Sequence, residues 1–152
     1  MKTTHLILIF SVMIALAGTR TAFAAGDLTA QTPEEIKVQL GDKDNALRFF
    51  PEKLEFETGK LYKLVLHNPS TSAHYFSSET LARAVFTRKA QVLAPDGKTI
   101  AEIKGNISEI EVYPGGTAEW WFVPVKTVTT NDLKCTVKGH IEKGMVGVIT
   151  IK

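Results

Sequence analysis

Residues 135–151 read CTVKGHIEKGMVGVITI, and this stretch decides the fold of the chain. Its last part, 146–151, alternates in hydrophobicity as a strand with one buried face does. Cys135, His140 and Met145 precede that strand at intervals of five residues, and we expect another strand to end near Cys135. The stretch therefore predicts two strands joined by a short loop that carries a thiol, an imidazole and a thioether.

The rest of the chain also has a strand-rich pattern. Short apolar runs alternate with turn residues such as Gly, Pro, Asn and Asp, which is typical of an all-β sandwich. We expect strands at 36–40, 61–66, 107–113 and 118–123. Residues 77–84 differ, because serines suited to an N-cap precede an acidic first turn and good helix formers. One short helix on a connecting segment is predicted there.

Residues 1–24 have the pattern of a removable signal peptide. Lys2 is followed by an apolar run over 6–17, which is too short to span a membrane, and 22–24 read AFA, a cleavage motif. We expect export to the periplasm, no membrane anchor after cleavage, a flexible arm over 25–33 and one domain over 34–152.

Removing this segment changes the charge and the count of rare residues. It removes Lys2 and Arg20 but no acidic residue, so the formal net charge of +2 becomes 0. No basic patch remains, which excludes a nucleic-acid-binding class. Cys135 is the only cysteine and cannot form an internal disulfide. Met145 becomes the only methionine.

The residues of the loop form a soft, mixed set of donors. Thiolate, imidazole and thioether ligands select copper over magnesium or calcium, and two histidines with one cysteine and a distant methionine form an electron-transfer copper site. His74, just past the end of the expected strand 61–66, can supply the second histidine. His67 is the alternative, but it closes that strand and we interpret it as a polar strand-end residue.

These motifs resemble those of the cupredoxins, a family of small blue copper proteins, over about residues 49–152. The residues that carry the resemblance are Phe50-Pro51, Leu54-Glu55-Phe56, Gly59, Asn68 with His74 six positions later, Pro114-Gly115, the run 118–122 and the loop 135–145 leading into 147–151.

The resemblance implies a Greek-key β-sandwich and one type 1 copper ion. His74, Cys135 and His140 would be the equatorial ligands and Met145 the axial one, with His140 as the exposed port for the electron. The implied function is a one-electron carrier, not an enzyme, and a monomer. Its partners would be redox proteins such as a c-type cytochrome or a copper-containing reductase or oxidase.

Two positions depart from the family pattern. Lys138 stands where relatives often have proline, and Tyr75 stands where relatives often have an asparagine that braces the cysteine segment. Neither change removes a ligand, but hydrogen bonds around ligands tune a metal. Val137, Ile141, Lys138 and Lys143 would form a small docking patch that suits an acidic partner.

Two other functions are compatible with these residues. A periplasmic copper carrier or buffer would hold the ion without redox cycling, although such proteins tend to gather more methionines or histidines. A copper-free interaction domain would use only the sandwich. The colour of the copper-loaded protein separates these functions.

Overall fold

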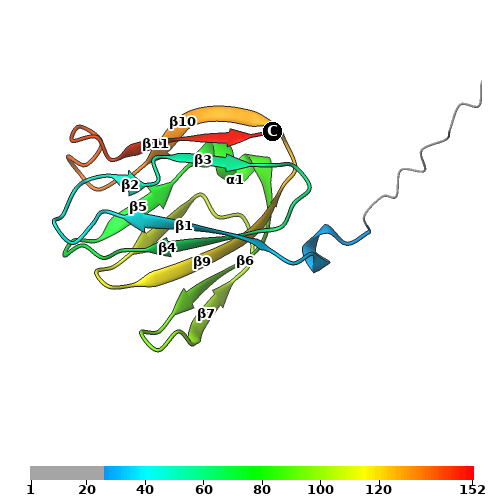
Figure 1. Ribbon diagram of the computed structural model, residues 1–152, viewed down its shortest axis with the longest axis horizontal. Coiled ribbons are helices and arrows are strands. Elements are labelled where there is room, and N and C mark those ends of the chain that lie inside the picture. Colours follow the sequence, from blue (N-terminus) through cyan, green and yellow to red (C-terminus); the bar gives the residue numbers. More distant parts are fainter. Residues whose placement is uncertain (1–25) are drawn as a thin grey trace, which may run out of the picture.

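The computed structural model describes residues 26–152, so the predicted signal segment lies outside the described residues. Strands dominate this part of the chain (Figure 1). The elements are η1 (Leu28–Ala30), β1 (Glu34–Leu40), β2 (Phe49–Phe50), β3 (Lys53–Phe56), β4 (Tyr62–His67), β5 (His74–Ser77), α1 (Glu79–Ala84), β6 (Val85–Leu93), β7 (Thr99–Ile103), β8 (Glu109–Val112), β9 (Thr117–Pro124), β10 (Val128–Lys134) and β11 (Val146–Ile151).

The strands form two mixed sheets, which confirms the predicted sandwich. One sheet has the order β2-β1-β4-β9-β6-β7 and the other β3-β11-β10-β5-β8. The pairs β1–β4 and β3–β11 are parallel and the others are antiparallel. Successive strands such as β4 and β5, or β8 and β9, belong to different sheets, so the chain crosses between the layers as in a Greek key.

The core lies between the sheets because inward side chains alternate with outward ones. In β4, Tyr62, Leu64 and Leu66 are buried, and their neighbours along the strand are partly exposed. Of the adjacent tryptophans, Trp120 is 2% exposed, whereas Trp121 lies on the outer face with the Lys89 ammonium 5.0 Å from its ring centroid. A strand turns successive side chains to opposite faces, and this explains the difference.

The predicted helix is present as α1. Ser78 caps it, since its hydroxyl accepts a hydrogen bond from the Leu81 N–H at 3.1 Å. Glu79 in the first turn and Arg83 in the last complement the helix dipole. Leu81 and Ala84 are buried against the sandwich, so the helix is held by packing as well as by its cap.

Several connections lie at the same end of the sandwich (Figure 1). Side-chain hydrogen bonds tie them together. The Asn68 amide donates to Ser72 O at 2.8 Å and to Val112 O at 2.7 Å. Asn45, after β1, accepts from the Thr71 N–H at 2.9 Å. The connection 135–145 joins β10 to β11 at this same end. The predicted ligand loop therefore lies beside connections that are held by these hydrogen bonds.

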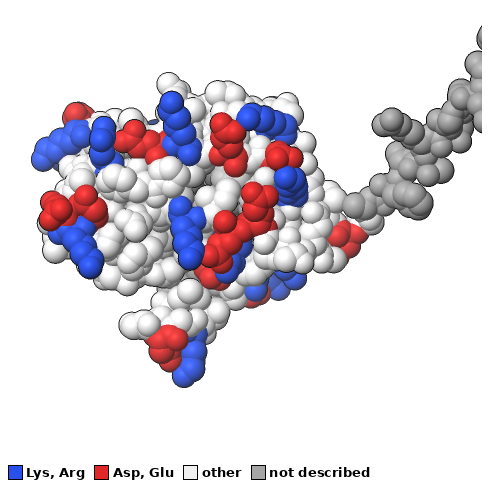
Figure 2. Space-filling view, viewed as in Figure 1, with Lys and Arg blue, Asp and Glu red and all other residues white. Residues whose placement is uncertain are grey.

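The surface carries charges of both signs. Basic and acidic side chains are interspersed over the face seen in Figure 2. Ion pairs on the outer face join neighbouring strands, as where Lys63 of β4 contacts Glu35 of β1 and Lys89 of β6 lies 3.4 Å from Glu102 of β7.

In the N-terminal segment predicted as an arm, the Gln31 side chain donates to Gly59 O at 2.8 Å. Within residues 26–152 neither helix has the length and apolarity to cross a membrane.

Candidate metal centre

The loop between β10 and β11 folds back on itself through backbone hydrogen bonds. Cys135 donates its N–H to Met145 O at 3.0 Å, and Met145 donates to His140 O at 2.9 Å. Gly139 and Gly144 have positive φ values of 84° and 94°, a conformation that glycine adopts without steric cost. These turns bring Cys135, His140 and Met145 together within one compact loop.

His74 lies outside the ligand loop, at the start of β5, and contributes its side chain to the same site. Its side chain is completely buried, and its register partner on β8 is Val112. The backbone of Gly41 passes so close that a Cβ atom at that position would lie 3.1 Å from His74 Nε2. The imidazole is therefore wedged between its own strand and the connection after β1.

The three predicted nitrogen and sulfur ligands converge. Cys135 Sγ lies 3.3 Å from His140 Nδ1 and 3.9 Å from His74 Nδ1, and one possible ligand atom from each of the three residues lies within 4.8 Å of the other two. The imidazole centroids are 5.1 Å apart. Donor atoms that face one another at these distances can close around a single ion.

The environment keeps both imidazoles ready to act as ligands. Burial lowers the pKa of His74, and the nearby His140 lowers it further. Burial, with a smaller effect from Lys143, also lowers the pKa of His140. A lowered pKa means that both rings are neutral at pH 7, and a neutral ring has a lone pair for a metal.

Cys135 is buried in the core and receives one further hydrogen bond. The backbone N–H of Tyr75 points at its sulfur, with nitrogen and sulfur 3.3 Å apart. Thus Tyr75, at one of the two positions that depart from the family pattern, contributes to the site through its backbone. Lys138, at the other, is exposed on the ligand loop.

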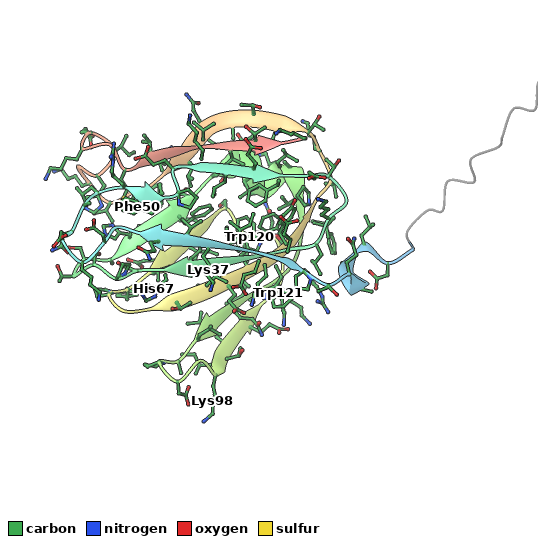
Figure 3. The ribbon with its side chains drawn as sticks, in the orientation of Figure 1. Lys37, Phe50, His67, Lys98, Trp120 and Trp121 are labelled. Carbon is green, nitrogen blue, oxygen red and sulfur yellow. The ribbon has the colours of Figure 1, made fainter. Side chains whose placement is uncertain are left out.

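Met145 and His67 occupy different places. Met145 is fully buried in the same cluster as Cys135, at the end of the ligand loop. His67 ends β4, where its Nδ1 lies 3.1 Å from Gly116 O and 3.0 Å from Thr117 Oγ1 (Figure 3). The structure brings His74, and not His67, into the cluster with Cys135 and His140.

Two residues support the site through contacts that were not predicted from the sequence. Gly41 limits the space beside His74, and buried Asn68 joins the connection before β5 to the last residue of β8. Gly41 stands out in the sequence only as a turn former, and Asn68 only as a turn former and as one of the residues that carry the family resemblance. Their contacts bridge distant parts of the chain, so local patterns do not reveal them.

Comparison with known structures identifies the fold. An auracyanin from Roseiflexus castenholzii, crystallised after reduction with dithionite, is 18% identical, with 80% of this chain and 99% of that chain covered at a TM-score of 0.53. Auracyanin A of Chloroflexus aurantiacus, a "blue" copper protein, is also 18% identical, with coverages of 80% and 100% and a TM-score of 0.51.

A larger protein contains a similar unit. A multicopper oxidase from Campylobacter jejuni is 16% identical over 81% of this chain but only 31% of its own, at a TM-score of 0.56. No protein-family model and no curated protein matches the chain. The two sheets and the His-Cys-His cluster at one end define the class: the chain has the cupredoxin fold.

Proposed function

We propose that this protein binds one copper ion through His74, Cys135, His140 and Met145 and carries one electron at a time between larger redox proteins. The observation that carries the proposal is the convergence of a thiol and two neutral imidazoles within 4.8 Å. Copper bound there would supply a one-electron redox couple, and the donor set matches the sites in which copper performs electron transfer.

The protein's own part is to hold the ligands still. Cys135 is fixed by the hydrogen bond to Met145 O, and His74 is enclosed by the Gly41 backbone. Ligands supported by strands and packed connections change position little when the charge of the site changes. The burial of His74, Cys135 and Met145 also keeps bulk water away from the ion.

His140 is the residue through which we propose that the electron enters and leaves. It is partly exposed, in contrast to the fully buried His74. Ile141 beside it is 43% exposed, and Val137 is half-buried. A small apolar patch around a partly exposed ligand suits a transient redox encounter, which requires little buried area. Lys138 and Lys143 would favour partners with acidic surfaces.

The share of each known structure that matches this chain supports a carrier rather than an enzyme. The auracyanins are matched over 99–100% of their lengths, whereas the oxidase is matched over 31%. Partners such as a c-type cytochrome, or a copper-containing reductase or oxidase, are proposed from the chemistry of a one-electron carrier. A periplasmic location is proposed from the signal pattern of 1–24, because an exported carrier would meet such partners there.

Addition of Cu(II) to the purified protein tests the proposal. We expect one copper ion per chain and an intense visible sulfur-to-copper absorption that a mild reductant bleaches and an oxidant restores. Tight Cu(I) binding without that colour would favour a copper carrier or buffer instead. No copper binding at all would leave the copper-free interaction domain as the function.

Histidine variants test the ligand set. We expect His74→Ala to abolish the sulfur-to-copper absorption, because it removes one of the three converging donors. His67→Ala is the matched control and should keep the absorption, since His67 hydrogen-bonds to Gly116 and Thr117 instead. The reverse result, loss of colour only in His67→Ala, would overturn the assignment of His74.

A further inference from the structure

The two strands that carry His74 and lead to Cys135 are joined by little backbone pairing. β5 and β10 are neighbours in the sheet, but Lys134↔Ser77 is their only register pair. By contrast, β5 pairs with β8 at four positions, from His74 to Ser77. The backbone ladder alone therefore leaves the spacing of His74 and Cys135 weakly determined.

The carboxylate of Asp132 provides a second connection between these strands. It accepts a hydrogen bond from Ser78 Oγ at 2.5 Å and another from the Thr80 N–H at 2.8 Å. Ser78 directly follows β5 and caps α1, and it is 2% exposed. Both bonds are partly buried, and hydrogen bonds to a charged group that is shielded from solvent are stronger than those at an exposed surface.

An irregularity in β10 turns Asp132 toward this junction. The register of β10 with β11 shifts between Thr130 and Leu133, and the Asp132 N–H bonds to the Thr130 hydroxyl at 3.2 Å. A bulge of this kind redirects a side chain and is a common device near functional sites. The carboxylate points to Ser78 and Thr80 at the junction of β5 and α1.

The Asp132 contacts and the sulfur contact lie on opposite sides of the single backbone pair. Cys135 lies three positions after Asp132, and Ser78 lies three positions after Tyr75. In antiparallel strands these intervals match, so the register that places Asp132 on Ser78 also places the Tyr75 N–H on Cys135 Sγ. Slippage of one strand would break both contacts.

We propose that Asp132 is a positioning residue that fixes the spacing of His74 and Cys135 by clamping β10 to the junction of β5 and α1. A further side-chain link from this segment, from Thr136 Oγ1 to Glu109 Oε2 of β8 at 2.8 Å, is exposed to solvent and contributes less. The effect of Asp132 on copper rests on the proposed function, but its effect on the strand pair does not.

Hydrogen exchange of the metal-free protein tests the clamp directly. In Asp132→Ala we expect the Tyr75 amide to exchange about ten-fold faster relative to the Trp120 amide than in wild type, because the local link that holds β10 to the junction of β5 and α1 is lost. The control Thr87→Val removes the Trp120 Nε1 hydrogen bond in the other sheet and should not raise that ratio. Equal acceleration of both amides in Asp132→Ala would overturn the proposal.

Copper-loaded variants test the consequence for the site. We expect Asp132→Ala to bind one copper ion with a shifted sulfur-to-copper absorption and a shifted reduction potential, whereas Thr87→Val matches wild type. Asp132→Asn keeps one acceptor for Ser78 and should lie between the two, which also covers the case that the alanine variant does not fold. A wild-type spectrum and potential in both Asp132 variants would overturn the role at the metal. Failure of the wild type itself to bind copper would refute the proposed function and leave the exchange test valid.

Discussion

At the scale of single residues, the candidate metal centre consists of three converging donors and a backbone, that of Gly41, which passes close to one of them. Cys135 and Met145 stand out in the sequence because each is the only residue of its type after the first 24 residues. The choice of His74 over His67 followed from its place after a strand end, and the structure places it in the cluster. Gly41 gave only a turn signal, although its backbone limits the space around His74.

Gly41→Ala tests whether that close approach matters to the site. The new methyl group would meet His74 Nε2 at 3.1 Å, and the φ of 77° disfavours alanine. We expect a loss of about 1–2 kcal/mol in the free energy of unfolding and a shifted sulfur-to-copper absorption.

Gly59→Ala is the matched control for this prediction. Gly59 has a φ of 81°, but a Cβ there would contact nothing within 4 Å. It should lose a similar stability through backbone strain and keep the wild-type absorption. An unchanged spectrum in Gly41→Ala would contradict a role of this contact in placing His74.

At the scale of elements, a strand was predictable where one of its faces is buried. In β4, β11 and the first part of β9, buried residues alternate with residues that are at least partly exposed. β5 is short and buried on nearly every residue, and all five residues of β7 are exposed, so neither has a period of two. The helix α1 was predictable because its cap and charges are local signals.

The pH dependence of stability tests the contact between α1 and β10. Burial raises the pKa of Asp132, but the hydrogen bonds from Ser78 and Thr80 outweigh it, and the net pKa is lowered. A carboxyl group with a lowered pKa stabilises the fold above its unfolded-state pKa of about 4, and this stability is lost as the pH falls through the folded-state pKa.

We therefore expect Asp132→Asn to be less stable than wild type by about 1–2 kcal/mol at pH 7, with the difference shrinking below about pH 4. Chemical denaturation at several pH values measures it, and the other carboxylates cancel in the comparison. A difference that stays constant from pH 7 to pH 2 would show that the charge of Asp132 contributes nothing.

At the scale of the whole molecule, we expect the rate of electron transfer to depend more on where a charged side chain lies than on the net charge of the protein. Lys138 is exposed on the ligand loop, and Lys126 is exposed on the connection between β9 and β10. Since β10 runs from residue 128 toward Cys135, Lys126 lies at the end of the sandwich away from the candidate metal centre. The two lysines thus offer the same charge at opposite ends of the fold.

Lys138→Glu and Lys126→Glu together test whether electrons leave through the His140 end. The copper-loaded, reduced protein is mixed with hexacyanoferrate(III), an anionic oxidant, and the second-order rate constant is measured at increasing salt. Lys138→Glu should slow the reaction about ten-fold at 10 mM ionic strength, because it replaces attraction by repulsion beside His140. The effect should fade near 1 M salt, where charges are screened beyond about 3 Å. Lys126→Glu changes the net charge equally but should slow the reaction much less, and equal slowing by the two variants would contradict an electron port at His140.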